Sequence, residues 1–472
     1  MNCDNVLYFF EKINEIPRGS GNEKAISDYL VAFAKERNLW VHQDKANNVI
    51  IKKAGSNGYE NHKPVVIQGH MDMVCEKNND VIHDFLKDPI KVIYDGDFIH
   101  ADGTTLGADD GIAVAMAMAV LDDKNAVHPP IEVVITTDEE VGMLGAASLD
   151  TSIIEGRTLL NIDSEEEGVF TVGCAGGVKI NLTIPVDFVE AIGSHFMRII
   201  ITGLEGGHSG IDINKERANA NKIMGRLLHR LVSVENVEIA SLNGGAKDNA
   251  IPRYAETVIC CNDCDSVEAT VNIFAEEIKA EYATTDKNIQ INTESIEISD
   301  NVFTKDSAER VISAIMLMPN GIQSNNIELN MPESSNNLGV VKMDKESVCL
   351  VCAVRSSLFT KKTFIRSQIE TIAKLCGGTT KSRGDYPAWE YKADSPLRDI
   401  FVDVYREFYN DEPKVETVHA GLECGLIAEK VPDMDMISFG PNLLDIHTPK
   451  ERASILSIER VWNFLCKVLE RL

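Results

Sequence analysis

The chain has 472 residues, a formal net charge of −27 and a hydrophobic share of 44%. Its length predicts two domains rather than one, and its composition argues against a disordered chain. The acidic balance argues against nucleic acid and anionic membrane surfaces as partners, because both select patches rich in lysine and arginine.

The eleven cysteines are scattered along the chain, and its first residues lack the basic and apolar regions of a signal peptide. No apolar run approaches the length of a membrane span. We therefore expect reduced thiols and a cytoplasmic location. Cys261 and Cys264 form a C-x-x-C pair, which we interpret as structural.

Buried strands alternate with helices in the first part of the chain. Taken in order, the predicted elements are a helix over residues 20–39 capped by Ser20 or Asn22, strands near 48–53 and 64–68, two short strands turned at Asp95-Gly96, a mostly apolar helix over 111–123, and strands over 131–137 and 158–162. This alternation predicts an α/β domain with helices on both faces of its sheet.

The order of elements changes between about residues 193 and 383. The predicted elements there are a strand over 196–203, a helix over 214–232, strands over 237–244 and 254–261, a helix over 266–282 and a strand over 288–298. This order is the ferredoxin-like pattern. A strand over 434–441 and a helix over 454–472 then return to the α/β pattern. We predict a mixed-sheet α/β domain over residues 1–188 and 387–472, interrupted by a ferredoxin-like α+β domain over 189–386.

Acidic and histidine side chains follow the predicted strands of the α/β part. They are His70 and Asp72, then Asp138, Glu139 and Glu140, then Asp163, and finally Asp445 and His447, with Asp109-Asp110 opening the apolar helix inside GADDG. Open α/β sheets place ligand sites beyond the carboxyl ends of their strands. We therefore expect these side chains to converge.

Each of these features alone has a common structural explanation. An H-x-D spacing arises by chance, GADDG is typical of a turn, SEEEG of a solvated loop, and D-E-E of a helix N-terminus. Chance does not explain why they follow one strand after another. Imidazole and carboxylate ligands suit zinc, with cobalt or manganese as alternatives. Their number exceeds what one ion needs, which predicts two divalent ions sharing a bridging carboxylate.

Five motifs, GHMDMV, GADDG, TTDEEVG, NIDSEEEG and GGHSG, occur in this order. Together they resemble the dinuclear zinc peptidases that include aminoacylase, glutamate carboxypeptidase and carnosinase, and most closely the cytosolic aminoacyl-histidine (Xaa-His) dipeptidases. The resemblance covers essentially the whole chain. It implies a zinc-binding catalytic domain with an inserted lid domain that commonly dimerises, and a dipeptide as the substrate.

The resemblance also implies which residues hold the metal ions. His70 and Asp163 would hold one ion, Glu140 and His447 the other, and Asp109 would bridge them. The spacing alone does not choose between Asp109 and its neighbour Asp110, and His419 competes with His447 as a ligand. His419 is expected instead to line the substrate pocket.

The remaining roles concern catalysis and substrate. The ions would activate a water molecule, and Glu139 would act as general base. Asp72 would hydrogen-bond the free nitrogen of His70, and His208 in GGHSG would stabilise the transition state, often from the partner subunit. The expected substrate-binding groups are Arg355 for the free carboxylate, Asn249 and the backbone around Gly421 beside it, and Glu423 for the free amino group.

Three other hypotheses stay open. The first is an N-acyl amino acid deacylase or desuccinylase with the same chemistry. The second is a non-catalytic metal-binding scaffold, whose sequence sign would be loss of the base or of a ligand; neither is missing. The third is an ordinary α/β protein with acidic loops that arose by chance.

Overall fold

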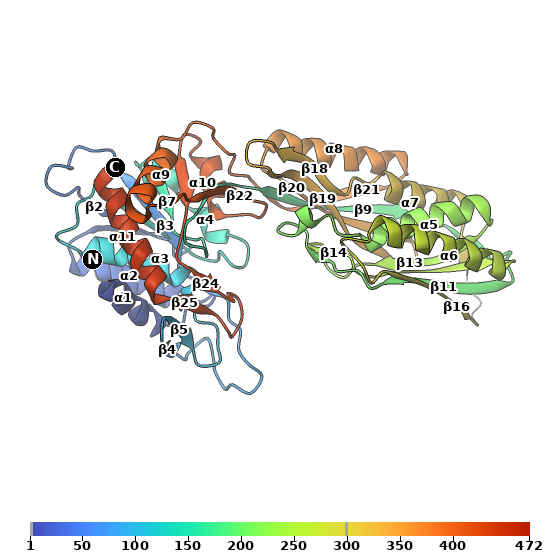
Figure 1. The fold of residues 1–472 in the computed structure, drawn as a ribbon, viewed down its shortest axis with the longest axis horizontal. Helices are drawn as coiled ribbons and strands as arrows, with labels where there is room; N and C mark the ends of the chain where they lie inside the picture. Colours follow the sequence, from blue (N-terminus) through green and yellow to red (C-terminus); the bar gives the residue numbers. More distant parts are fainter. Residues whose placement is uncertain (1–2, 298–300) are drawn as a thin grey trace. The chain divides into compact units, whose positions relative to one another are not determined.

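The computed structural model describes residues 3–297 and 301–472, which divide into two compact units (Figure 1). Unit 2 comprises Ala175–Glu390 and Val418–Gly421, and unit 1 comprises the rest of the chain. The first crossing lies after Cys174, earlier than the boundary expected after residue 188. The reason is that β9 (Gly176–Pro185) pairs with strands of unit 2, β20 (Ser347–Ser356) and β21 (Thr379–Tyr386).

Unit 1 is built on a mixed sheet. In spatial order its strands are β1 (Trp40–Gln43), β2 (Val49–Lys53), β6 (Ile131–Thr136), β3 (Val65–His70), β7 (Thr158–Asn161), β23 (Asp435–Ser438), β8 (Val169–Cys174) and β22 (Lys414–Val418). The central strands β6, β3, β7 and β23 run parallel, so their carboxyl ends meet at one edge. A smaller sheet has the order β24 (Leu443–Leu444), β25 (Arg452–Ser454), β5 (Phe98–Ala101) and β4 (Val92–Asp95).

Helices cover both faces of the mixed sheet. Those of unit 1 are α1 (Asp4–Asn14), α2 (Lys24–Glu36), α3 (Ala108–Asp122), α4 (Leu144–Ser148), α9 (Pro396–Tyr409), α10 (Glu423–Lys430) and α11 (Ile455–Arg471), with a 3-10 turn at Thr151–Ile153. Gly69 faces α3, since a Cβ there would lie 2.8 Å from Ala113 Cβ. Gln68 donates to Glu423 of α10. Neighbouring strand residues point to opposite faces, so α3 and α10 cover opposite faces, as predicted.

The predicted cap of the first α/β helix is wrong. Helix α2 begins at Lys24 after Glu23, and no side chain caps it. Ser20, expected as the cap, instead donates its hydroxyl to Asp72 Oδ2 at 2.8 Å. The carboxylate of Glu23 accepts the backbone N–H groups of Gly21 and Asp138. Long-range hydrogen bonds therefore outweigh the local capping pattern here.

Unit 2 is built on one extended sheet. Its strand order is β16 (Gln290–Ile296), β11 (His195–Thr202), β15 (Ala255–Cys261), β13 (Glu238–Gly244), β19 (Met331–Met343), β20, β9 and β21, with β18 (Gly321–Asn326) paired to β19. Helices α5 (Ala220–Val234), α6 (Cys264–Glu281), α7 (Lys305–Leu317) and α8 (Phe359–Leu375) run along one face (Figure 1). Short ladders join β10 (Phe188–Glu190) to β17 (Asn301–Phe303) and β12 (Gly207–His208) to β14 (Ala250–Ile251), and a 3-10 turn covers Ile213–Lys215.

The predicted ferredoxin-like pattern is confirmed. The succession β11-α5-β13-β15-α6-β16 forms an antiparallel sheet in the order β16-β11-β15-β13. Helix α5 begins six residues later than residue 214, the expected start, with Asn219 as its cap. Residue 298, the last of the predicted strand over 288–298, lies outside the described residues.

The same pattern occurs a second time in unit 2. The succession β9-α7-β19-β20-α8-β21 gives the order β21-β9-β20-β19, and the two copies meet where β13 pairs with β19 at Gly244 and Val341. The sequence does not reveal this duplication, because the whole first copy separates β9 from α7.

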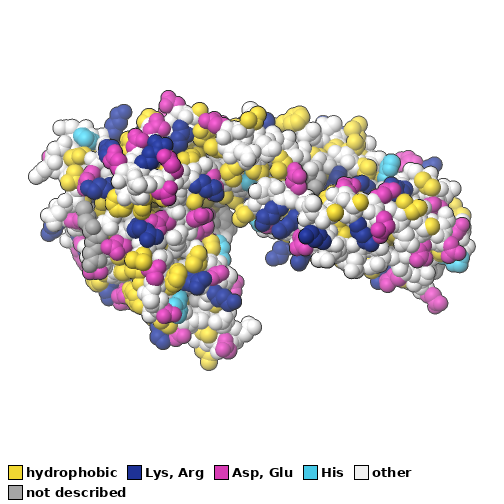
Figure 2. All heavy atoms as spheres, viewed as in Figure 1, with side chains coloured by type: hydrophobic (Ala, Val, Ile, Leu, Met, Phe, Trp, Pro, Cys, Tyr) yellow, Lys and Arg dark blue, Asp and Glu magenta, His cyan; other side chains and the backbone are white. Residues whose placement is uncertain are grey.

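Acidic and basic side chains are interspersed over the visible face of the molecule (Figure 2). In the described part of the chain, every helix is too short or too polar to cross a membrane. The cysteines are free thiols. Cys261 and Cys264 lie with their sulfur atoms 3.6 Å apart.

Candidate metal centre

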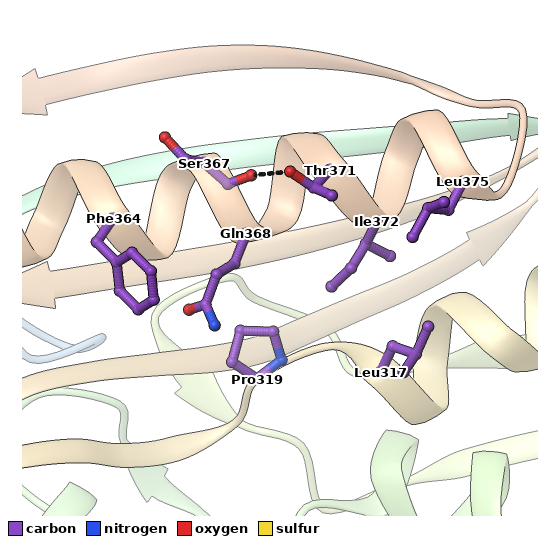
Figure 3. A pocket seen from close by; sticks show the side chains of 8 residues that line it. All are labelled: Leu317, Pro319, Phe364, Ser367, Gln368, Thr371, Ile372 and Leu375. Atoms are coloured by element: carbon purple, nitrogen blue, oxygen red, sulfur yellow. Dashed lines mark hydrogen bonds between the residues drawn. The ribbon is translucent and has the colours of Figure 1, made fainter.

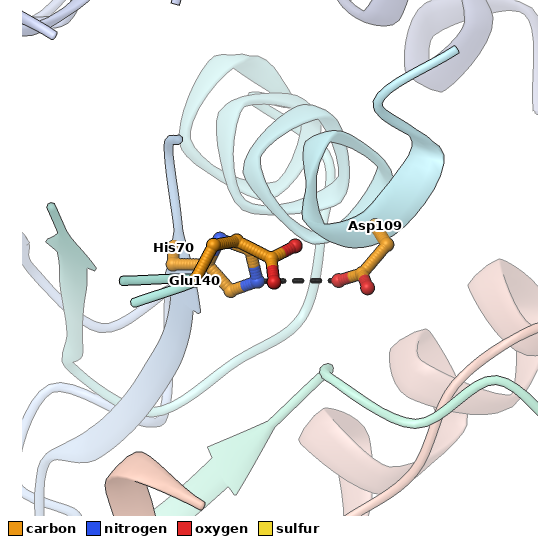
Figure 4. A group of neighbouring side chains, drawn as sticks. All are labelled: His70, Asp109 and Glu140. Carbon is orange, nitrogen blue, oxygen red and sulfur yellow. Dashed lines mark hydrogen bonds and ion pairs between the residues drawn. The ribbon is translucent and has the colours of Figure 1, made fainter. Parts of the chain in front are cut away.

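Polar side chains from separate segments of unit 1 converge at the carboxyl ends of the parallel strands. His70 ends β3, Glu139 and Glu140 follow β6, and Asp163 follows β7. Asp109 lies at the start of α3, where it faces His70 and Glu140 (Figure 4). This convergence is the one expected from the sequence, and it follows from the parallel pairing of β3 with both β6 and β7.

Asp109 lies between two histidines. Its Oδ1 is 3.2 Å from His70 Nε2 and its Oδ2 is 3.1 Å from His447 Nε2. A further carboxylate accompanies each histidine. His70 Nε2 lies 3.6 Å from Asp163 Oδ1, and His447 Nε2 lies 3.1 Å from Glu140 Oε1. Each half of the cluster therefore contains one imidazole, one carboxylate and one oxygen of Asp109.

These distances fit divalent cations. Tetrahedral zinc holds N and O ligands at about 2.0–2.1 Å, which places two such ligand atoms about 3.3 Å apart. The ligand atoms of His70, Asp109 and Glu140 lie within 4.8 Å of one another, and so do those of His70, Asp110 and Asp163. The donor set is also the imidazole and carboxylate set that zinc, cobalt and manganese accept.

Asp110 has different surroundings from Asp109. The peptide bond between the two residues is cis. The Oδ2 atom of Asp110 accepts the backbone N–H of His70 at 3.1 Å, and the side chain is buried. Burial raises the pKa of Asp110 well above its usual value, and the charge of Asp163 raises it further.

Asp72 connects two parts of the cluster. Its Oδ1 lies 3.3 Å from His70 Nδ1 and accepts the backbone N–H of Glu139 at 3.0 Å. Its Oδ2 accepts the backbone N–H of Glu140 at 3.3 Å. Met71 is fully buried in the core, as expected for a residue between two inward-facing polar side chains. The D-E-E segment does not begin a helix, since α4 starts only at Leu144.

The crowding of carboxylates shifts the pKa values of the cluster. Hydrogen bonding to Asp109, and then to Glu140, raises the pKa of His447 to about 10. Burial would lower the pKa of His70, but the carboxylates around it raise that pKa well above its usual value. Burial raises the pKa of Glu139 to about 9. Without cations the centre therefore holds protons at neutral pH.

Metal binding is expected to release protons. The pKa of His447 is raised to about 10, so its imidazole carries a proton at pH 7, and the carboxylates around His70 raise its pKa in the same direction; an imidazole ligand must be neutral. Competition by protons weakens as the pH rises, so apparent metal affinity should increase between pH 6 and pH 8. Calorimetric titration of zinc in two buffers of different ionisation enthalpy measures the release. We expect at least one proton per chain, and a value of zero would contradict these protonation states.

The predicted catalytic residue His208 and the predicted substrate residues Arg355 and His419 lie together within unit 2. A Cβ on Gly210 would be 3.1 Å from both His208 Cε1 and Arg355 Nε, and 2.5 Å from the carbonyl oxygen of His419. Burial and then the charge of Arg355 lower the pKa of His419 to about 4, and the same causes lower the pKa of His208. Neutral imidazoles beside a guanidinium form a group suited to an anion.

The other predicted residues are placed as follows. The backbone carbonyl of Asn249 accepts the N–H of Ser209, next to the β12–β14 ladder that holds His208. His419 Nε2 lies 2.8 Å from Ser335 Oγ, whereas His447 contacts the carboxylates of the cluster. Gly421 belongs to unit 2 and lies just before α10.

Glu423 lies buried beside the strands of unit 1. Its side chain is fully buried, and its Oε2 accepts hydrogen bonds from Gln68 and Thr136, both at 2.6 Å. Burial raises its pKa to about 7. It is the first residue of α10, and its Oε1 has no hydrogen-bond partner among the described residues, so contact with a substrate amino group stays a prediction.

Two buried charged residues next to the centre were not predicted from the sequence. The guanidinium of Arg18 donates to the carbonyl oxygens of Met71 and Asp72, and the carboxylate of Glu451 accepts backbone N–H groups from Leu106 to Asp109. The glycines of GADDG are the sequence feature that could have indicated a buried side chain at this place, because they leave the space that Arg18 occupies.

An apolar groove of about 380 Å³ lies in unit 2, between the end of α7 and helix α8 (Figure 3). Its lining side chains are apolar or uncharged: Leu317, Pro319, Phe364, Ser367, Gln368, Thr371, Ile372 and Leu375. A groove without titratable groups offers no acid–base or metal chemistry, so the candidate site is the cluster in unit 1.

A histidine–carboxylate cluster at the strand ends of an α/β sheet is typical of metal-dependent hydrolases. Residues 66–471 match peptidase family M20/M25/M40, and the chain belongs to this family. It is 38% identical over 468 residues to the cytosol non-specific dipeptidase of Escherichia coli K12. The aligned region covers 98% of this chain and 96% of that protein.

Solved structures agree with this assignment. The crystal structure of aminoacylhistidine dipeptidase from Vibrio alginolyticus is similar with a TM-score of 0.96 and 38% identity, over 99% of this chain and 96% of that one. Aminopeptidase PepT from Bacillus cereus shares the fold, with a TM-score of 0.58 at 16% identity over 100% and 98% of the two chains. The family resemblance of the five sequence motifs is thereby confirmed.

Proposed function

We propose that this protein is a metal-dependent dipeptidase that hydrolyses Xaa-His and other dipeptides with water activated by two divalent ions. The observation that carries the proposal is the position of Asp109, whose two carboxylate oxygens face two different histidines, each accompanied by a further carboxylate. Similarity to two dipeptidases over nearly the full chain supports the substrate class.

The ligand roles follow from the two halves of the cluster. His70 and Asp163 would hold one ion, Glu140 and His447 would hold the other, and Asp109 would contribute an oxygen to each. Zinc suits this donor set best, with cobalt or manganese as alternatives. When bound, the ions polarise the scissile carbonyl and lower the pKa of the attacking water.

The residues around the ions move the proton and fix the geometry. Glu139 takes the proton of the attacking water and passes it to the leaving amine. Two nearby cations would lower the pKa of Glu139, which burial raises to about 9. Asp72 orients His70 through the Nδ1 atom and holds the backbone of Glu139.

The residues around the guanidinium of Arg355 in unit 2 recognise the dipeptide. Arg355 binds its free carboxylate, assisted by Asn249, His419 and the backbone at Gly421, and His208 donates to the oxyanion of the transition state. The hydroxyl of Tyr386 accepts a hydrogen bond from Arg355 Nη1 at 3.0 Å, which supports one orientation of the guanidinium. The same proposal includes a lid role for unit 2, a homodimer and a cytoplasmic location. The name of the E. coli relative, a cytosol dipeptidase, supports the cytoplasmic location.

A substrate panel tests the proposal. The protein is stripped with a chelator, and zinc, cobalt or manganese is returned singly before dipeptides and N-acyl amino acids are compared. We expect metal-dependent hydrolysis of dipeptides with free amino groups. Preferred hydrolysis of N-acyl amino acids would indicate a deacylase instead, and stoichiometric metal binding without hydrolysis of either class would indicate a scaffold.

A further inference from the structure

Arg18 is a buried cation next to the metal centre. It is 2% exposed, and its guanidinium donates to the carbonyl oxygens of Met71 at 3.1 Å, Asp72 at 3.3 Å and Gly107. An arginine stays protonated in a protein, and a buried charge is costly unless it is paired. Arg18 thus connects the segment that carries His70 to the loop that precedes Asp109.

Glu451 is a buried carboxylate that contacts the same loop. It is 2% exposed, and its two oxygens accept four consecutive backbone N–H groups, from Leu106 at 2.7 Å, Gly107 at 3.0 Å, Ala108 at 2.7 Å and Asp109 at 3.3 Å. Such N–H groups at the start of a helix attract negative charge. Glu451 follows His447 by four residues, so it connects the segment that carries His447 to the same loop.

The glycines of GADDG give independent support. A Cβ on Gly107 would lie 2.5 Å from Arg18 Nη2, and a Cβ on Gly111 would lie 2.6 Å from the same atom. Gly107 also has a positive φ of 69°. Gly111 does not, so the reason for a glycine there is space, for the guanidinium first and also for the ring of Phe10, whose Cε2 would lie 3.0 Å from that Cβ.

We propose that Arg18 and Glu451 form a buried brace that positions the two histidine ligands on either side of Asp109. The brace is defined by these two residues, and the inference rests on the proposed two-metal function. Arg18 holds the His70 segment and Glu451 holds the His447 segment, both against residues 106–109. Because Asp109 faces one histidine with each oxygen, these two attachments set the separation of the metal positions.

Glu451→Gln is the direct test. The amide keeps the size of the side chain but places an NH2 group against backbone N–H donors and removes the charge. We expect the His447 segment to loosen, so that binding of one zinc ion weakens by about 10–100-fold, as for other groups that orient metal ligands. Zinc content should fall from two towards one per chain at a free zinc concentration that fills both positions in the parent. The absorption spectrum of the cobalt-loaded protein gives a second readout that does not depend on activity.

Two further variants separate positioning from folding. Gly111→Ala leaves both charged residues in place but crowds Arg18, and we expect the same loss of zinc in a protein that still folds. Glu132→Gln is the matched control, because Glu132 is also 2% exposed and accepts the N–H groups of Glu155 and Gly156, but lies at the opposite end of β6 from the cluster. It should lower the melting temperature and keep two zinc ions.

The outcomes are distinct. Two zinc ions bound with parental affinity in both Glu451→Gln and Gly111→Ala would overturn the brace, and so would equal zinc loss in Glu132→Gln. A parent that binds fewer than two ions, or that hydrolyses no dipeptide, would overturn the proposed function instead.

Discussion

Glu139→Gln is expected to keep both metal positions filled while kcat for dipeptide hydrolysis falls by about 10³-fold. The amide cannot accept the proton of the attacking water, and general-base catalysis contributes about 10²–10⁴-fold. The carboxylate of Glu139 makes no hydrogen bond or ion pair with His70 or His447 in the described structure. Its replacement by an amide should therefore leave the metal ligands in place. Elemental analysis for zinc and saturation kinetics on one dipeptide measure the two quantities.

Glu140→Gln is the matched control for this experiment. It changes the neighbouring residue in the same way, but Glu140 Oε1 lies 3.1 Å from His447 Nε2. We expect this variant to lose zinc as well as activity. If Glu139→Gln retained more than about a tenth of the parental kcat, Glu139 would no longer be a candidate for the base.

Asp109→Asn is expected to abolish dinuclear loading. The asparagine amide would offer one neutral oxygen where the carboxylate of Asp109 presents an anionic oxygen to each histidine. We expect zinc affinity to fall by at least about 100-fold, since removal of a ligand should exceed the 10–100-fold effect of an outer residue. Hydrolysis should fall to the background rate. Zinc titration of the chelated protein checks the first expectation, and the dipeptide assay checks the second.

Asp110→Asn is the comparison that decides between the two adjacent aspartates. The pKa of Asp110 is raised well above its usual value, and its Oδ2 accepts the N–H of His70. An asparagine oxygen can accept the same N–H, so we expect zinc content close to that of the parent. The reverse result, zinc loss in Asp110→Asn and retention in Asp109→Asn, would make Asp110 the bridging residue.

Much of the centre could be predicted from local sequence patterns. The strand ending at His70, the strand before Glu139 and the strand before Asp163 all have short apolar runs that are typical of buried strands, and the structure contains them. Parallel strands bring their carboxyl ends to one edge. The convergence of His70, Glu140 and Asp163 therefore required no knowledge of side-chain packing.

Other features depend on contacts between distant segments. The burial of Glu423 follows from hydrogen bonds to Gln68 and Thr136, far away in the chain. The duplicated pattern of unit 2 is hidden because its second copy is interrupted by the first. The spacing of residues along the chain indicates only the local period of a helix or strand. It therefore predicts neither the burial of Glu423 nor the duplication in unit 2.

The sequence by itself therefore determined the class of fold, the strand-end residues and the family motifs, because strand and helix periods and strand-end positions are local properties. Only the tertiary structure decided that the two oxygens of Asp109 face His70 and His447. It alone placed Arg18 and Glu451 against residues 106–109. The physical reason is that the segments packed around a carboxylate or a buried charge set its direction and its partner. These segments can be far apart in the sequence: Glu451 and Gly107, which are hydrogen-bonded, are separated by hundreds of residues.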